Sequence, residues 1–346
     1  MRGGASREVT QPSGERRARI IAHRIGMRFS CGMNSPLGLI AVVVWALASP
    51  LMAEPKPVPK MQIIPQPRDQ VSFQREGVEI ARYHFGADGQ RPFVFPIMGP
   101  SGRSLTRIGH PRDPQSHSHH NSVWMSHQNV MGLNFWEDKR AGGIVHRRMI
   151  RMEDGDDRAF VEAENGWLNN EGAPVLHELR RTAIRVLENG EWLLEIDTQL
   201  ESRTTEVELG QTAFGLLGVR MAKTIGVKDG GGTIRNSEGG IDEAGCFRKP
   251  ARWVDYSGPI THGVSEGITL MDHPLNLNHP VPFHVRDDGW MGAAVTFSAA
   301  HVIRPNKPLR LRYALYVHAG RPAPEQIEAR WKAFSVSEFT PFVAKQ

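Results

Sequence analysis

Cysteine is almost absent from this chain of 346 residues, which contains only Cys31 and Cys246. Cys31 lies within an N-terminal segment that is expected to be removed, so the mature chain would keep one thiol and no internal disulfide. No local pattern around Cys246 is typical of a thiol nucleophile. A small fold held by disulfides is therefore excluded, and stability has to come from a hydrophobic core.

An excess of charge of one sign is also missing from most of the chain. The whole sequence has 42 Lys and Arg against 37 Asp and Glu. Residues 1–53 hold seven Arg and two Glu, so the rest carries 35 basic (42 − 7) and 35 acidic (37 − 2) side chains. A neutral body lacks the basic surface that binds a phosphate backbone, and we expect no nucleic-acid partner.

Long apolar runs are absent except at residues 36–53, PLGLIAVVVWALASPLMA. Arg24 and Arg28 precede this run and small residues end it, which is the layout of a secretory signal peptide. We expect cleavage after Ala53, a periplasmic or secreted protein, and no stable membrane span in the mature chain. The alternative is that the run remains as a single membrane anchor.

Three parts are predicted along the chain. Residues 1–53 are an N-terminal extension and signal peptide, in which either Met1 or Met27 is the true start. Residues 54–70 are rich in proline and are expected to be a linker without regular structure. Residues 71–346 show no break in composition and are predicted to form a single β-sandwich domain.

Short segments that alternate or group apolar residues dominate the body and predict strands. They are residues 78–85, 91–98, 143–153, 158–168, 175–187, 191–202, 214–222, 268–273, 283–288, 293–299 and 309–320. Asn189-Gly190 between two of them is a strong hairpin signal. Only residues 325–334 predict a helix. Strands that follow strands favour an all-β fold, namely a large antiparallel β-sandwich with one C-terminal helix, or a large barrel.

Compact catalytic motifs are missing as well. The chain has no HExxH pattern, and its glycine clusters at 229–233 and 237–240 lack the Lys-Ser/Thr of a phosphate loop. The densest group of functional side chains is residues 110–138, with five of the fifteen histidines and two of the eight tryptophans. Because buried imidazoles need partners, such a stretch is more typical of a pocket than of a core.

Several blocks in fixed order resemble the PmoA family, also labelled methane oxygenase PmoA, which is in effect a family of unknown function. The blocks are residues 119–124 (HHNSVW), 129–136 (NVMGLNFW), 218–220 (GVR), 234–239 (IRNSEG), 252–258 (RWVDYSG), 272–276 (DHPLN) and 312–317 (RYALYV). The resemblance covers about residues 75–335 and implies a supersandwich like that of galactose mutarotase. Asn121 departs from the pattern, which has an arginine there.

Metal binding is one chemical interpretation of the histidines. In an extended chain His117 and His119 share a face, whereas His120 points the other way. A divalent metal is possible, and any site is expected to use His110, His117 and His119. No other cofactor is predicted.

Sugar binding is the favoured interpretation, because aromatic faces stack on sugar C–H surfaces while imidazoles, carboxylates and arginines bind hydroxyls. The predicted catalytic residues are His119, His120, Glu238, Asp272 and His273. The predicted substrate-binding residues are Trp124, Asn134, Trp136, Arg220, Asn236, Asp255, Tyr256, His284 and Arg286. One histidine and one carboxylate of these sets would act as acid and base.

The function predicted from the sequence is therefore an exported enzyme that acts on a carbohydrate ligand by epimerase, hydrolase or lyase chemistry. The sequence leaves two alternatives open. One is a carbohydrate-binding protein without catalysis, and the other is a metal-dependent oxidative enzyme, as the family label suggests.

Overall fold

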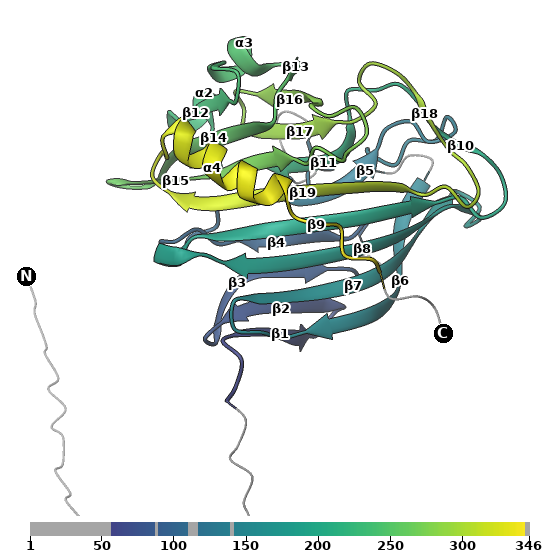
Figure 1. Cartoon of the computed structure of the whole chain (residues 1–346), viewed down its shortest axis with the longest axis horizontal. Helices are drawn as coiled ribbons and strands as arrows, with labels where there is room; N and C mark the ends of the chain where they lie inside the picture. Colours follow the sequence, from purple (N-terminus) through teal and green to yellow (C-terminus); the bar gives the residue numbers. More distant parts are fainter. Residues whose placement is uncertain (1–56, 87–88, 110–116, 139–141, 343–346) are drawn as a thin grey trace, which may run out of the picture. The chain divides into compact units, whose positions relative to one another are not determined.

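The alternating segments pair as antiparallel strands in two large sheets (Figure 1). The computed structural model describes residues 57–86, 89–109, 117–138 and 142–342. The predicted signal peptide and His110 lie outside these residues. Contacts divide the chain into Met1–Lys56 and Pro57–Gln346, and all of the described residues belong to the second unit.

Two large sheets and one separate strand pair contain the strands. The nine-stranded sheet has the order β1 (Met61–Gln66), β2 (Gln70–Arg75), β3 (Val78–His84), β4 (Phe93–Ile97), β5 (Val123–His127), β11 (Gly215–Arg220), β17 (Trp290–Ala294), β16 (Pro282–Arg286) and β13 (Lys249–Pro250). The eight-stranded sheet has the order β12 (Thr233–Asn236), β14 (Trp253–Thr261), β15 (Val264–Asp272), β19 (Leu309–Ala319), β9 (Trp192–Glu201), β8 (Pro174–Val186), β7 (Arg158–Asn169) and β6 (Gly142–Glu153). The separate pair joins β10 (Val207–Leu209) to β18 (His301–Ile303), and the helices are η1 (Glu188–Gly190), η2 (Lys223–Ile225), α2 (Val227–Gly230), α3 (Asp242–Cys246) and α4 (Pro324–Ser335).

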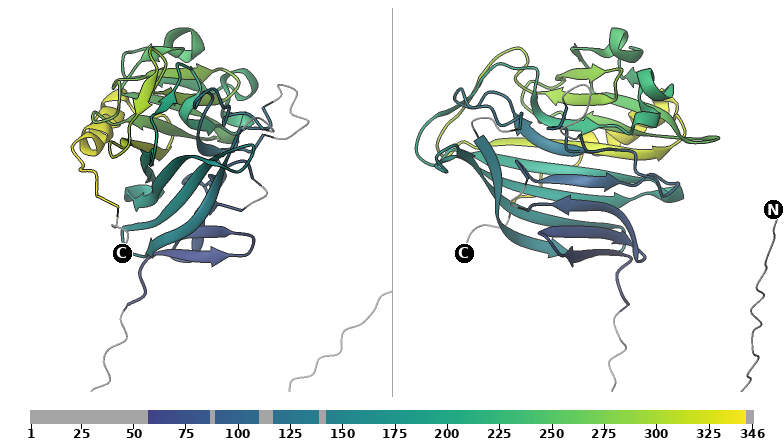
Figure 2. Two further views of the ribbon diagram at one scale, coloured as in Figure 1. Left: turned by 90° about the vertical axis from the view of Figure 1, so that its right-hand side faces the viewer. Right: turned by 180° about the vertical axis from the view of Figure 1, so that it is seen from behind.

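The two sheets lie face to face as two layers. Strands β6–β9 lie in front of β1–β4 in Figure 1, and the order is reversed when the unit is seen from behind in Figure 2. Successive side chains of a strand point to opposite faces, so each strand gives every second residue to the space between the layers. One large cluster of buried apolar residues from both sheets fills that space.

Helix α4 covers part of the outer face of the eight-stranded sheet. Its Ile327 and Phe334 join Met271 of β15 and Tyr316 of β19 in a second apolar cluster, separate from the main core. None of the helices in the described ranges has the length and hydrophobicity needed to cross a membrane. Helix α4 therefore covers the eight-stranded sheet and not the outer face of the nine-stranded sheet.

The predicted antiparallel β-sandwich with a C-terminal helix is confirmed. The hairpin signal is confirmed as well, because Asn189 and Gly190 adopt φ of 57° and 78° between β8 and β9. The linker prediction is wrong for Met61–Gln66, which forms β1 and pairs with β2. Pro65 is tolerated there because β1 is an edge strand, where a missing N–H costs no hydrogen bond.

A buried ion pair on β8 faces the space between the layers. Arg180 of β8 donates to Glu178 through Nε (2.6 Å) and Nη2 (2.8 Å), and both side chains are shielded from solvent. Glu178 also accepts from Trp167 and Thr198. Burial acts to raise the pKa of Glu178, but Arg180 and these donors hold it below its usual value. The carboxylate is therefore charged within the core.

Replacement of Arg180 should show how much the core depends on this pair. We expect Arg180→Met to lower the free energy of unfolding by about 3–5 kcal/mol, because Glu178 would keep a buried charge without its partner. Urea denaturation provides the measurement. Arg148→Met is the control, because that side chain is 53% exposed beside Glu164 and should contribute no more than about 1 kcal/mol. Equal losses in both variants would contradict the assignment.

Candidate functional site

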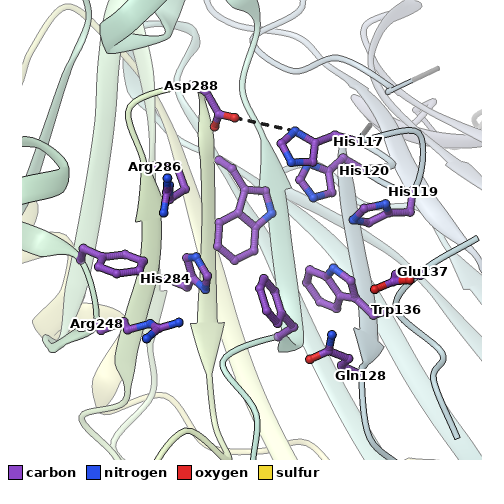
Figure 3. Close-up of a pocket in the computed structure, with 13 residues that line it drawn as sticks. His117, His119, His120, Gln128, Trp136, Glu137, Arg248, His284, Arg286 and Asp288 are labelled. Carbon is purple, nitrogen blue, oxygen red and sulfur yellow. Dashed lines mark ion pairs between the residues drawn. The ribbon is translucent and has the colours of Figure 1, made fainter. Parts of the chain in front are cut away.

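A pocket of about 410 Å³ opens on the outer face of the nine-stranded sheet (Figure 3). Its size is within the range of small-molecule sites. The lining residues come from β16, β17 and the segments that flank β5, β11 and β13: His117, His119, His120, Gln128, Trp136, Glu137, Phe214, Phe247, Arg248, His284, Arg286, Asp288 and Trp290.

Two glycines of the central strands create the floor of this site. Gly218 of β11 pairs with Trp124 on one side and with Gly292 of β17 on the other, and Gly292 pairs with His284. A Cβ at Gly218 would lie 2.6 Å from Cζ2 of Trp124, and one at Gly292 would lie 3.0 Å from Cζ2 of Trp290. The indoles therefore lie over sheet positions that have no side chain.

An aromatic cluster stands on this floor and is separate from the main core. Trp124, Trp136 and Trp290 form it, with Phe93 and Phe214 packed against it. His120 stacks at 5.0 Å from the Trp124 ring and 5.8 Å from the Trp290 ring. The predicted Trp124 and Trp136 are thus brought together with a third tryptophan, Trp290. Trp136 and Trp290 line the pocket.

The three histidines before β5 do not follow the geometry expected from an extended chain. Residues 118–119 form a turn, and the His120 N–H donates to the carbonyl of His117 (3.1 Å). The rings of His117 and His120 consequently stack at 4.5 Å, and the ring of His119 lies edge-on at 4.5 Å from His120. The expectation that His120 points away from His117 and His119 was wrong, because it assumed an extended chain, whereas the chain turns here and places the three rings next to one another.

Arg91, which the sequence did not single out, joins the two segments that bear these groups. Its guanidinium donates to the His119 carbonyl (3.0 Å) and the Asn121 Oδ1 (2.6 Å), and also to the carbonyls of Phe135 (3.1 Å) and Trp136 (2.8 Å). The side chain is buried, and burial lowers its pKa to about 10 against the effect of a nearby carboxylate. Asn121 thus serves as an acceptor for an arginine from elsewhere in the chain.

Asn134 holds the second of these segments in shape. Its Oδ1 accepts the backbone N–H groups of Trp136 (2.9 Å) and Glu137 (3.1 Å). Such a local side-chain turn is a common role of asparagine. Asn134 therefore positions Trp136, although it was predicted to bind substrate itself.

Arg220 lies beneath the pocket and connects two of its polar groups. Its Nη1 donates to Asp288 Oδ1 (3.0 Å), and its Nη2 lies 3.5 Å from the Nδ1 of His117. Asp288 Oδ2 lies 3.7 Å from the same nitrogen. Because Arg220 is fully buried, it cannot stack on or surround a ligand, but it fixes the orientation of His117 and Asp288.

Burial makes the other pocket imidazoles neutral at pH 7. It lowers the pKa of His119 to about 4, opposed by Asp138, and the pKa of His284 to about 4, assisted by Arg248. Burial, assisted by His119, also lowers the pKa of His120 well below its usual value. Neutral imidazoles offer one donor and one acceptor each, which suits hydroxyl groups.

The histidine turn does not have the geometry of a metal site as it stands. The stacked rings of His117 and His120 are parallel within 10°, so their in-plane lone pairs do not converge on one point. In the part of the chain that is described, no three His, Cys, Asp or Glu side chains are arranged to hold an ion. The predicted set with His110 lies partly outside the described residues and stays a prediction.

Other predicted site residues are built into the sandwich away from the pocket. Asp272 accepts from Asn276 (2.7 Å) and pairs with His279 (2.7 Å). His273 packs on Phe334 of α4 and contacts the Ser337 carbonyl through Nε2 (3.2 Å). These groups satisfy one another around the C-terminal helix and do not line the pocket, so a catalytic role for Asp272 and His273 stays a prediction.

The blocks around β12 and β14 are also structural. Asp255 is fully buried and binds His318 (2.9 Å) and Arg235, while Asn236 caps the turn after β12. Glu238 is exposed and pairs with Arg252 (3.0 Å). The pocket lining does not include Asp255, Asn236 or Glu238.

Tyr256 supports the site from behind. Its hydroxyl lies within hydrogen-bond distance of the carbonyls of Arg286 (3.2 Å) and Asp287 (3.1 Å), at the turn between β16 and β17. This turn carries Asp288 and leads into Trp290. The sequence also missed Gln128, Glu137, Phe214, Phe247, Arg248, Asp288 and Trp290. Of these, only Asp288 and Trp290 carried a signal, because residues 287–290 (DDGW) form a polar turn that overlaps the end of the predicted strand 283–288.

The one thiol of the described residues has no part in the site. Cys246 is buried at the end of α3. Burial and the nearby Asp242 raise its pKa to about 12, so it remains a thiol at neutral pH.

Comparison with known proteins places these features in a family. A model described as a family of unknown function, DUF6807, matches residues 70–332. Among solved structures, a putative mutarotase from Salmonella typhimurium aligns with 81% of this chain and 100% of its own, at 10% sequence identity and a TM-score of 0.33. No match is found among curated proteins. The likeness to the Salmonella protein is too weak to transfer any property.

Arg91 provides a test of how the site is assembled. We expect Arg91→Lys to lower the free energy of unfolding by at least about 2 kcal/mol, because lysine cannot reach all four acceptors and leaves buried carbonyls unpaired. The near-ultraviolet circular dichroism of the tryptophans should change in the folded state as well. Arg103→Lys, at an exposed position, should leave both measurements unchanged. A folded-state spectrum unaffected by Arg91→Lys would contradict this role.

The neutral histidines predict a dependence of stability on pH. The folded pKa of His119 and His284, about 4, lies below the ordinary 6.5, so the unfolded chain binds protons first as the pH falls. Their contribution to stability is complete above about pH 6.5 and is lost as the pH falls through 4. In urea denaturation, a double His119→Gln, His284→Gln variant should show a shallower decline across this window. A His262→Gln control on the exposed β14–β15 turn should keep the original slope, and an unchanged slope in the double variant would be evidence against the assignment.

Proposed function

The chain belongs to DUF6807, a family of unknown function, and we propose that its pocket binds a carbohydrate and performs acid–base chemistry on it. The PmoA label remains an interpretation of sequence motifs and contributes nothing to this proposal. Export through an N-terminal signal, which would place the activity in the periplasm or outside the cell, is part of the proposal.

The observation that carries the proposal is the combination of indole surfaces, neutral imidazoles and carboxylates in one pocket of about 410 Å³. Trp136, Trp290 and Phe214 offer ring surfaces on which the C–H face of a pyranose can stack. His119 and His284 offer hydrogen-bonding groups without a charge that would need hydration. This combination suits a ligand with apolar faces and a polar rim, which is the character of a sugar.

Unpaired polar atoms around the pocket also support a polar ligand. Within the described residues, the Nδ1 atoms of His120 and His284 and the Nε1 atoms of Trp124 and Trp290 are buried without a hydrogen-bond partner. Native cores contain few such groups. Three of these four residues, His120, His284 and Trp290, line the pocket.

Proton transfer is assigned to His117 and a pocket carboxylate. Arg220 and Asp288 orient the Nδ1 side of His117, and Nε2 is proposed as the atom that exchanges the proton. Glu137 is the second carboxylate at the pocket and lies beside His119 and Trp136 (Figure 3). Epimerisation at C1 would follow if one group removes the proton of the C1 hydroxyl while the other protonates the ring oxygen O5, so that the C1–O5 bond breaks to an open-chain aldehyde. O5 then attacks the other face of C1, and the two proton transfers are reversed.

His119 and His120 are assigned to binding rather than catalysis. A histidine with a pKa of about 4, as His119 has, is too weak a base to accept a proton readily at pH 7. Hydrolysis and β-elimination use the same kinds of groups, so the reaction is proposed here only as acid–base chemistry on a sugar.

The test is a panel of mono- and oligosaccharides, with binding read from tryptophan fluorescence and product from NMR spectra. We expect His117→Gln to lower kcat about 100-fold or more with little change in affinity. Trp136→Ala should weaken binding about tenfold through the loss of stacking. Glu238→Gln is the matched control, because Glu238 pairs with Arg252 outside the pocket.

Each outcome has a distinct meaning. If no sugar of the panel binds, the proposed function is wrong. Binding without any product would retain the carbohydrate ligand and remove the catalytic assignment. Loss of turnover in Glu238→Gln but not in His117→Gln would move the site to the Arg252 region.

A further inference from the structure

The pocket has two ends of different chemistry (Figure 3). His117, His119, His120 and Glu137 occupy one side, whereas Arg248 and Arg286 occupy the other, next to His284. The histidine side therefore presents imidazole rings and the Glu137 carboxylate, with Asp288 next to His117. The opposite side presents two guanidinium groups.

Phe247 contacts both arginines. The Cζ of Arg248 lies 4.8 Å from the centroid of this ring, and the Cζ of Arg286 lies 5.4 Å from it. Both distances are within the range of cation–π contact. Two guanidinium groups beside one ring give this side of the pocket a positive potential, which attracts an anion.

Arg248 is held in an unusual backbone conformation. Its φ is 57°, a region that costs energy for a residue with a side chain, and its N–H donates to the Phe283 carbonyl (2.8 Å). This geometry directs the residue from the end of α3 toward the pocket, where Figure 3 shows it beside His284.

The charge of the pair is only partly compensated. Arg286 Nε lies 3.2 Å from Glu243 Oε1, a pair in which the Arg286 side chain is 50% exposed. Within the described residues Arg248 has no ion-pair partner. The positive potential of both arginines reaches His284. Burial is the main cause of the lowered pKa of His284, and Arg248 and Arg286 lower it additionally.

We infer that the pocket selects a sugar that carries an anionic group, and that Arg248 and Arg286 bind that group. This inference rests on the proposed function and adds the substrate class. Carboxylate, sulfate and phosphate groups share paired oxygens that match the donor fork of a guanidinium. Opposite Arg248 and Arg286, the sugar ring would lie over the tryptophans with its hydroxyls toward the histidine side.

The test compares matched ligands: glucose, glucuronate, glucose 6-sulfate and glucose 6-phosphate, together with the galactose series. Tryptophan fluorescence or calorimetry measures each Kd. We expect at least one anionic sugar to bind about tenfold or more tightly than its neutral counterpart, because charged hydrogen bonds are added. Higher ionic strength should weaken the binding of that ligand and leave the affinity for the neutral sugar unchanged. The anionic sugar with the lowest Kd among the carboxylate, sulfate and phosphate forms identifies the preferred anionic group.

Substitutions then test which residues cause the preference. Arg248→Gln and Arg286→Gln should each raise the Kd of the anionic sugar about tenfold and change the Kd of the neutral sugar by no more than about twofold. Arg304→Gln is the control, an exposed arginine paired with Glu206 outside the pocket. Both pocket positions are exposed or half-exposed, so the fold should persist, which unfolding curves will check.

Three results would overturn the inference in different ways. Equal affinity for neutral and anionic sugars, with both lost in Trp136→Ala, removes the anionic preference and keeps the proposed function. Absence of any sugar binding removes both. A preference for anionic sugars that survives in both Arg248→Gln and Arg286→Gln would contradict the assigned residues.

Discussion

The hydrogen bonds of Arg91 are the interaction on which the candidate site depends. This one buried guanidinium binds the carbonyls of His119, Phe135 and Trp136 and the side chain of Asn121. Loops alone would not hold a histidine turn against an indole, because their backbone groups need partners wherever water is excluded. The guanidinium of Arg91 satisfies three such carbonyls and the Asn121 Oδ1 at once, so the aromatic and imidazole parts of the pocket keep a fixed geometry.

The second constraint is that the two faces of the nine-stranded sheet have different roles: one packs in the core and the other carries the pocket. Alternation along β11 and β17 sends Val219 and Met291 into the core and leaves Gly218 and Gly292 facing outward. The missing side chains make room for indoles to lie against the sheet, where a Cβ would collide with them. A rigid β-sheet therefore forms the floor of the pocket, and loops supply its polar rim, which is a common arrangement for sites on β scaffolds.

Most charged groups outside the pocket serve the architecture. Asp255, Asp272 and Glu178 are all buried, and each is surrounded by donors that satisfy it. These are the same residue types that a sugar-binding site needs, which is why the sequence blocks around Asp255 and Asp272 were predicted to be part of it. A carboxylate in a satisfied network and one at a pocket cannot be told apart by residue type, because the difference lies in which partners the fold brings near.

Sequence patterns alone were sufficient for the all-β antiparallel class, the C-terminal helix and the hairpin at Asn189-Gly190, because periodicity and turn residues act locally. The density of imidazoles and indoles also singled out residues 110–138, which supply His119, His120 and Trp136 to the pocket. Three features appear only in the folded chain: the stacking of His117 on His120, the link that Arg91 makes to Trp136, and the completion of the pocket by His284, Arg286 and Asp288. Those contacts join residues up to about 170 positions apart, and no local pattern encodes which strands become neighbours in a sheet.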